Sequence, residues 1–165
     1  MELVKARGIA EKYMEQLRPH CFRIEIAGSI RREKPEVKDI EIVAIPRPYE
    51  SIGIFQTGIA TVVNQWPKVK GELPCKYTQR LLPEGIKLDL FFANKNNWGL
   101  IFAIRTGSAE YSHQILAKGW VAKGCKSIEG HLYYHGHTVQ TSEEEDIFKL
   151  IGIPWTEPSK REVDE

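Results

Sequence analysis

The sequence predicts a mixed α+β fold, because helical and strand patterns of apolar residues both occur along the chain. Residues 2–18 carry apolar side chains at close to helical spacing, and Pro19 ends that pattern. Residues 22–26 alternate apolar and polar side chains, and residues 40–45 form a mostly apolar run, as strands do. Proline, glycine and charged residues separate these segments. We therefore expect a mixed sheet covered by helices.

Further strands and a second helix follow in the first two thirds of the chain. Apolar residues within 51–66 predict a second covering helix, which Pro67 ends. A strand is expected near residues 75–81 and another over residues 86–93. The turn sequence at residues 83–85 lies between them, so we expect these two strands to form a hairpin.

The last third of the chain predicts a small α/β subdomain. Residues 99–104 are apolar and fit a helix or a helix–strand joint, and a further helix is expected from residue 109 to 118. Residues 132–134 and 138–140 predict a hairpin around Gly136. Polar and acidic residues that suit a helix cap precede a short helix over residues 144–150.

Composition limits the classes of protein that fit. A chain of 165 residues with 42% hydrophobic residues can form one compact domain with a small appendage. Its 23 basic and 22 acidic residues leave a net charge of +1, so any affinity for nucleic acid has to come from local clusters of charge.

Cysteine usage and hydropathy indicate a soluble intracellular protein. Cys21, Cys75 and Cys125 are widely spaced and odd in number, which favours free thiols in a reducing compartment over a disulfide framework or a zinc site. No apolar run approaches the roughly 20 residues of a membrane span, and the first residues lack a signal-peptide core. We expect the protein in the cytoplasm, or in the nucleoid or nucleus, and expect no membrane partner.

The stretch from Ala27 to Val43 contains a candidate phosphate site. Gly28 has no Cβ, so a phosphate group can approach the main chain there, and the hydroxyl and amide of Ser29 can both donate to it. Arg31 and Arg32 follow within one helical turn, where a guanidinium can bind phosphate oxygens in a bidentate manner.

A pair of acids follows in the segment Asp39-Ile40-Glu41-Ile42. Side chains alternate across a strand, so Asp39 and Glu41 share one face while the two isoleucines enter the core. Two carboxylates at this spacing can bind a pair of hard divalent cations. The alternative is that both acids belong to an ordinary solvated face.

A third acid, Asp89, interrupts the apolar strand of residues 86–93. A carboxylate in such a strand is costly unless it meets a cation, a hydrogen-bond donor or solvent. One interpretation is a structural salt bridge with Lys87 or Arg80. The other is that Asp89 joins Asp39 and Glu41 as the third carboxylate of one site.

Gly-Ser, two arginines and an acid-x-acid pair occur within fourteen residues, an order that resembles the nucleotidyltransferase superfamily. The form Gly-Ser-x-Arg-Arg at this distance from the acids is similar to family X DNA polymerases, the polymerase beta-like enzymes. Thr106-Gly107-Ser108 lies seventeen residues after Asp89, and Gly152-Ile153-Pro154-Trp155 comes near the end of the chain, as in that family. The resemblance runs nearly end to end and implies a family X core reduced to a palm, residues 1–104, and a C-terminal polymerase subdomain, residues 105–165.

The resemblance implies a metal-dependent DNA polymerase that adds nucleotides to a primer 3′-hydroxyl in gap-filling repair. Its partners would be a nucleoside triphosphate and a DNA primer–template or gapped DNA, and no protein partner is indicated. The catalytic acids, which would hold two Mg²⁺ ions with Mn²⁺ as a possible substitute, would be Asp39, Glu41 and Asp89. Substrate binding would fall to Gly28, Ser29 and Arg32 at the phosphates and to Thr106, Gly107 and Ser108 at the sugar.

Two departures from the family pattern leave other functions open. Glu41 stands where the family usually has Asp, and Ile104 and Arg105 replace the aromatic or small pair before Thr-Gly. One alternative is a nucleotidyltransferase that acts on an RNA end, a protein or a small molecule. The other is a nonenzymatic module that binds nucleic acid.

Overall fold

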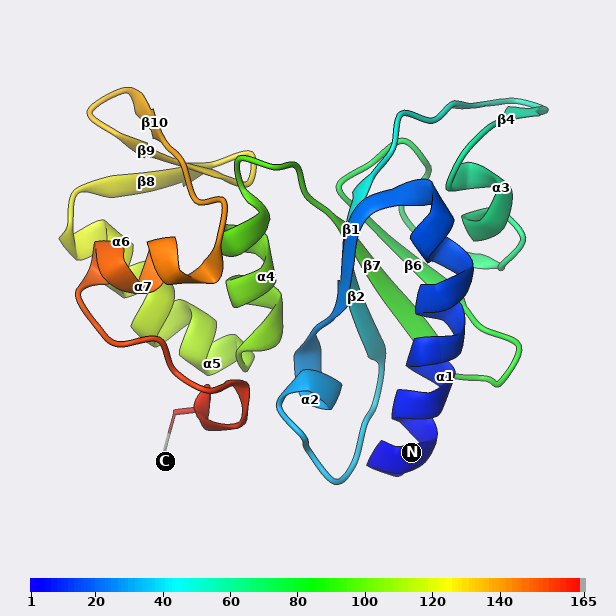
Figure 1. Ribbon diagram of the computed structural model, residues 1–165, viewed down its shortest axis with the longest axis horizontal. Coiled ribbons are helices and arrows are strands. Elements are labelled where there is room, and N and C mark those ends of the chain that lie inside the picture. The colour runs from blue at the N-terminus through cyan, green and yellow to red at the C-terminus, as the bar shows by residue number, and fades with distance from the viewer. Residues whose placement is uncertain (164–165) are drawn as a thin grey trace. The chain divides into compact units, whose positions relative to one another are not determined.

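The computed structural model describes residues 1–163, and its fold is mixed α+β as predicted. The chain divides into two compact units, Met1–Ala93 and Asn94–Glu165 (Figure 1). Each unit has its own apolar core. The predicted boundary between residues 104 and 105 falls inside helix α4, Trp98–Thr106. This helix packs on α7, Glu144–Ile151, so the compact units do not follow the predicted boundary.

A five-stranded mixed sheet forms the first unit, in the order β1-β2-β7-β6-β5. Strands β2 and β7 pair in parallel, and the other neighbours pair antiparallel. The strands predicted at residues 22–26, 40–45 and 86–93, and the hairpin of the last with the strand near 75–81, are confirmed. The strand bounds are β1 Cys21–Ile26, β2 Ile40–Pro46, β5 Lys68–Lys70, β6 Tyr77–Leu81 and β7 Lys87–Phe92.

Helix α1, Leu3–Leu17, covers one face of this sheet (Figure 1). Its apolar stripe supplies five buried side chains to the core of the unit, and a 3₁₀ turn over Arg18–His20 follows it. The strands contribute their apolar face to the same core. The members from β1, β2 and β7 are Cys21, Ile24, Ile40, Ile42, Ala44, Leu88 and Leu90.

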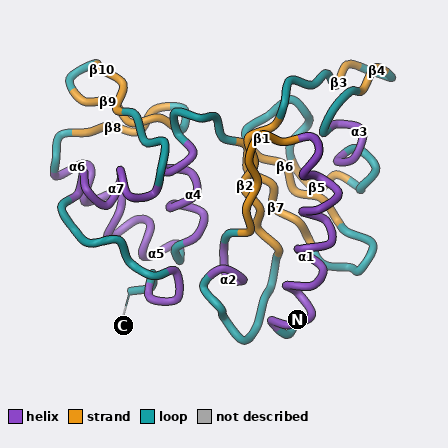
Figure 2. Tube along the Cα trace, in the orientation of Figure 1, coloured by secondary structure: helices purple, strands orange, loops and turns teal. Residues whose placement is uncertain are grey.

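The prediction of a helix over residues 51–66 is wrong. This segment forms a two-stranded hairpin and then a single helical turn, as the tube in Figure 2 shows. Gly53 and Gly58 adopt φ angles of +57° and +60°, which are incompatible with a continuous helix. Of the apolar residues that suggested a helix, Ile54 is exposed on the hairpin, whereas Ile59, Val63 and Trp66 reach the core from the short helical turn and the residues beside it. The bounds are β3 Ser51–Ile52, β4 Phe55–Gln56 and α3 Ala60–Val63.

Helices and a three-stranded antiparallel sheet, in the order β10-β9-β8, form the second unit. The predicted hairpin and the predicted last helix are confirmed, and β8 is an additional strand. The capping box of α7 links Glu143 and Asp146. The remaining bounds are α5 Ala109–Tyr111, a π-helical segment Ser112–Ala117, α6 Lys118–Ala122, β8 Cys125–Ile128, β9 His131–Tyr134, β10 His137–Val139 and a 3₁₀ turn Pro158–Lys160.

The three cysteines are free thiols, as predicted. Within residues 1–163, no helix combines the length and the apolar character that a membrane span requires.

A buried ion pair fixes the C-terminal segment of the second unit. Arg161, which is 0% exposed, donates from Nη1 to Glu144 Oε2 at 2.5 Å and from Nε to the carbonyl of Thr156 at 2.8 Å. Its guanidinium also lies 5.0 Å from the ring centre of Phe148. The carbonyl of Arg161 accepts the Ser108 N–H at 3.0 Å. The ion pair therefore holds the chain that anchors the Thr106-Gly107-Ser108 turn.

Arg161→Met should lower the free energy of unfolding by about 3–5 kcal/mol, because it leaves the Glu144 carboxylate buried without its cationic partner. Urea denaturation measures this change. The adjacent and exposed Lys160→Met is the matched control and should shift stability by less than about 0.5 kcal/mol. Equal, small losses in both variants would contradict the role of the ion pair.

Candidate active site

Glu41 and Asp89 lie side by side in the sheet of the first unit. They are register partners in the parallel pairing of β2 with β7, so their side chains leave the same face. Asp39 stands two residues before Glu41, directly ahead of the first residue of β2. The structure therefore brings the three predicted acids together at one end of two adjacent strands.

The carboxylate of Asp89 is nearly buried, at 7% exposure, and is held by donors from β6. Its Oδ1 accepts from the Tyr77 hydroxyl at 2.6 Å and from Gln79 Nε2 at 2.8 Å. Gln79 is the register partner of Asp89 across β6 and β7, and the Tyr77 ring stacks on Phe91 with the centroids 4.8 Å apart. These bonds explain how the apolar strand tolerates an acid.

Arg80 does not neutralise Asp89, so the salt bridge considered between these two residues is wrong. Its guanidinium donates to Thr78 Oγ1, to the carbonyl of Trp66 and to Asn64 Oδ1. Arg80 follows Gln79 in β6, so the two side chains leave opposite faces of the sheet. Tyr77 and Gln79 were missed by the sequence analysis, although their two-residue spacing in a strand next to Asp89 is the pattern that would have found them.

The acids influence one another electrostatically. The pKa of Asp39 is raised above its ordinary value, first by partial burial and then by the negative charge of Asp89. Lys38 and Lys87 oppose this shift. Asp39 and Asp89 are thus close enough to repel, and a cation between them would relieve both the repulsion and the burial of charge.

Gly28 packs directly against the carboxylate of Glu41. It adopts a φ of +62°, and a Cβ built on it would overlap Glu41 Oε2. The N–H of Ala27 donates to the carbonyl of Glu41 at 2.8 Å, which ties the bend to β2. The Gly-Ser bend therefore lies beside the acids, and glycine at its first position avoids both the overlap with Glu41 and the strain of a positive φ.

Ser29 and Arg32 extend this bend as part of the short helix α2, Gly28–Arg31, and its C-cap. The N–H of Arg32 donates to the carbonyl of Gly28 at 3.1 Å, and the N–H of Lys34 donates to that of Ser29 at 3.0 Å. Ser29, Arg31 and Arg32 are half-buried. The predicted phosphate-binding residues thus form one compact turn against the start of β2.

The Thr106-Gly107-Ser108 turn belongs to the second unit and ends α4. Thr106 is buried, and a Cβ at Gly107 would meet the ring of Tyr111. Ser108 is the N-cap of α5, because its Oγ accepts the Tyr111 N–H at 3.1 Å. The turn is therefore rigidly held within its own unit.

The acids fit divalent cations by donor type, because carboxylates are the ligands that Mg²⁺ and Mn²⁺ prefer. Their side chains do not converge on a single point. Among residues 1–163, no group of three or more His, Cys, Asp or Glu side chains is arranged to hold one metal ion. Asp89 Oδ1 is turned to Tyr77 and Gln79, while Glu41 lies against Gly28.

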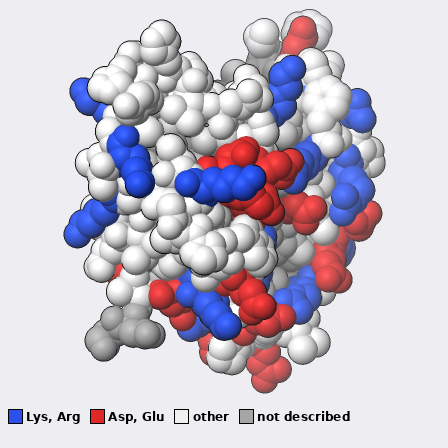
Figure 3. Space-filling view, turned by 60° about the vertical axis from the view of Figure 1, so that its left-hand side comes forward, with Lys and Arg blue, Asp and Glu red and all other residues white. Residues whose placement is uncertain are grey.

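Charge on the surface is mixed in sign. Basic and acidic side chains stand next to one another on the face drawn in Figure 3, in keeping with the net charge of +1. In the second unit Lys118, Lys123 and Lys126 are exposed, and Trp120 is a core residue. The three lysines are therefore available for contacts with phosphate groups.

Residues 103–162 match the family model described as the DNA polymerase beta thumb. No curated protein matches the chain. The match covers most of the second unit and supports a relationship to the polymerase beta-like proteins of family X. It does not extend to the sheet that carries the three acids.

Asp39→Asn should raise stability near neutral pH in metal-free buffer. The folded-state pKa of Asp39 is raised, so ionisation of this carboxyl destabilises the folded protein as pH rises from 3.8, the ordinary value, through the shifted one. Asp39→Asn should therefore be more stable than the wild type at pH values above the raised pKa. At pH values below the ordinary pKa the two should be equally stable. Urea denaturation across pH measures the difference, with the exposed Glu11→Gln as control. A gain that does not depend on pH would contradict the electrostatic origin.

Gly28→Ala should cost more stability than Gly85→Ala. Both positions have positive φ, +62° and +87°, which costs a residue with a Cβ about 1–2 kcal/mol. Only at Gly28 does the added Cβ also overlap Glu41, whereas nothing lies within 4 Å at Gly85. Adding Glu41→Ala should recover part of the loss in a double-mutant cycle measured by denaturation. Equal losses at the two glycines would contradict the contact.

Proposed function

We propose that the protein is a metal-dependent nucleotidyltransferase, a minimal DNA polymerase of the family X type, which adds nucleotides to a primer 3′-hydroxyl in gap-filling repair. The observation that carries the proposal is the pairing of Glu41 with Asp89 beside the Gly28 bend. The match of residues 103–162 to a polymerase thumb supports DNA as the partner.

The three acids would hold the cations in this proposal. Asp39, Glu41 and Asp89 would bind two Mg²⁺ ions, for which Mn²⁺ could substitute. When bound, such ions lower the pKa of the attacking hydroxyl and neutralise the leaving pyrophosphate. The mutual repulsion of Asp39 and Asp89 makes this end of the sheet attractive to cations.

Neighbouring residues would position the reacting groups. Tyr77 and Gln79 fix one oxygen of Asp89 and leave its orientation little freedom. The missing Cβ of Gly28 would leave room for the β- and γ-phosphates, the N–H and hydroxyl of Ser29 would donate to their oxygens, and Arg32 would supply positive charge. Glu41 would have to move away from Gly28 as the phosphates enter, because its carboxylate lies against that position.

The second unit would supply the sugar and DNA contacts. The rigid Thr106-Gly107-Ser108 turn would line the sugar pocket of the incoming nucleotide. The exposed lysines at positions 118, 123 and 126 would contact backbone phosphates, so affinity for DNA should fall as salt rises.

A nonenzymatic module that binds nucleic acid is the second candidate. The observation that favours it is that no three-carboxylate group converges among the described residues. A transferase with a non-DNA acceptor would use the same acids, and the thumb match argues for DNA instead.

Primer extension on gapped DNA tests the proposal. Wild type should incorporate nucleotides with Mg²⁺ or Mn²⁺, and Asp89→Asn should lower the rate by about a hundredfold or more, because a metal ligand is lost. Asp39→Asn should do the same, and the exposed Glu11→Gln should retain the wild-type rate. Melting curves establish that each variant is folded.

Unchanged incorporation in both Asn variants would overturn the assignment of the acids. Labelled-nucleotide transfer to an RNA end or a small acceptor in preference to gapped DNA would favour the other transferase. Failure of the folded wild type both to incorporate nucleotides and to bind Mg²⁺–triphosphate in calorimetry would favour the module.

A further inference from the structure

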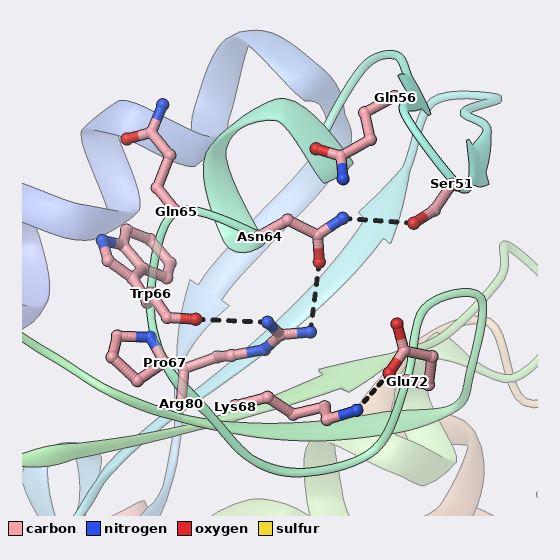
Figure 4. Close-up of a pocket in the computed structure, with 10 residues that line it drawn as sticks. Ser51, Gln56, Asn64, Gln65, Trp66, Pro67, Lys68, Glu72 and Arg80 are labelled. Atoms are coloured by element: carbon pink, nitrogen blue, oxygen red, sulfur yellow. Dashed lines mark hydrogen bonds and ion pairs between the residues drawn. The ribbon is translucent and has the colours of Figure 1, made fainter.

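A polar pocket of about 510 Å³ lies in the first unit, apart from the acids (Figure 4). The β3–β4 hairpin, the end of α3 and strands β5 and β6 contribute its walls. Hydroxyl, amide and cationic groups dominate the lining. They come from Ser51, Gln56, Asn64, Gln65, Lys68 and Arg80.

Arg80 is the unusual member of this lining, because its guanidinium is buried among neutral partners. The residue is 3% exposed, and it donates to Thr78 Oγ1 at 3.0 Å, to the Trp66 carbonyl at 3.2 Å and to Asn64 Oδ1 at 3.3 Å. A guanidinium has five N–H donors, and the three acceptors use three of them, so two N–H groups remain available for a ligand. Within residues 1–163, no carboxylate forms an ion pair with Arg80.

Burying this charge is costly, and burial lowers the pKa of the Arg80 guanidinium accordingly. Elsewhere in the protein the same cost is offset by a carboxylate, as at Arg161 and Glu144. At Arg80 the negative charge of Glu72 acts only from beyond ion-pair distance, and Glu72 is exposed and paired with Lys68, so an anion in the pocket would be the direct counter-charge. A bound oxyanion could accept both remaining N–H groups in a bidentate manner.

Other hydrogen-bond donors line the same pocket. Asn64 bridges the pocket, since its Nδ2 donates to Ser51 Oγ at 3.1 Å while its Oδ1 accepts from Arg80. Lys68 lies on the wall, where it pairs with the exposed Glu72. With Arg80 and Lys68 against Glu72, the lining keeps one excess positive charge, and Figure 4 shows the Gln56 amide on the hairpin side.

The pocket is separate from the acids, because successive side chains of β6 leave opposite faces of the sheet. Gln79 donates to Asp89 on one face, and Arg80, the next residue, leaves the opposite face. A ligand at Arg80 therefore occupies a different face of the sheet from the acids and the Gly28 bend.

We propose that this pocket is a binding site for a small oxyanion, a phosphate or a carboxylate group, with Arg80 as its anchor. Arg80 provides the paired N–H donors, and Lys68 adds long-range attraction at the wall. The cavity exceeds the size of a single anion, so the polar body of a phosphorylated or carboxylated metabolite would extend toward the Gln56 amide.

Titration of the full ¹⁵N-labelled chain, followed by NMR, tests the site. Inorganic phosphate, a nucleoside monophosphate and acetate are the three probes, and they separate free phosphate, a phosphate ester and a carboxylate. At least one probe should produce saturable shifts at the backbone amides of Asn64, Gln65, Trp66 and Lys68 and at the Asn64 side chain. Lys68→Glu should weaken binding about tenfold by reversing a charge at the wall.

Lys70→Glu is the matched control, because Lys70 is exposed on the same strand and does not line the pocket. It should change affinity less than about twofold. Arg80→Lys should abolish saturation, provided that its melting curve shows a folded protein. Binding should persist in Asp89→Asn, which separates this site from the proposed catalysis.

The absence of saturable shifts with all three probes in the folded wild type would overturn the proposal. Equal weakening by Lys68→Glu and Lys70→Glu would overturn it as well, because the attraction would then be that of the whole surface.

Discussion

The parallel pairing of β2 with β7 is the constraint on which the candidate active site depends. It sets Glu41 beside Asp89, and the same register places Ile40, Ile42, Leu88 and Leu90 in the core on the opposite face. A slip of one residue would turn an acid toward the apolar core and turn apolar side chains out of it. The hydrophobic effect therefore fixes the register, and the register positions the carboxylates.

Elements with a strong local pattern were predictable from the sequence. The strands that carry Glu41 and Asp89 are mostly apolar runs of strand length, and the last helix has a capping box at its start. Residues 51–66 were not predictable in this way, because a single helical turn and its flanking residues bury apolar side chains at the spacing of a longer helix. Strand β8 was missed because most of its side chains are exposed and its apolar pattern is weak.

Within the site, the sequence alone predicted that the acids share one face of the sheet. It did not predict which side chains hydrogen-bond to them or pack against them. Tyr77 and Gln79 reach Asp89 only through the antiparallel register of β6 with β7, and the contact of Gly28 with Glu41 depends on the path of the bend. The same register turns Arg80 away from Asp89. Pairings between strands distant in sequence decide these contacts, and no local pattern encodes them.

Paramagnetic relaxation by Mn²⁺ in the presence of a nucleoside triphosphate tests most directly whether the three acids form one cation site. Bound Mn²⁺ broadens the NMR signals of nearby amides, so residues 27–32, 39–43 and 88–91 should lose intensity first, at Mn²⁺ concentrations well below that of the protein. Broadening that begins at other acidic side chains, or that spreads evenly over the surface, would contradict a shared cation site at Asp39, Glu41 and Asp89.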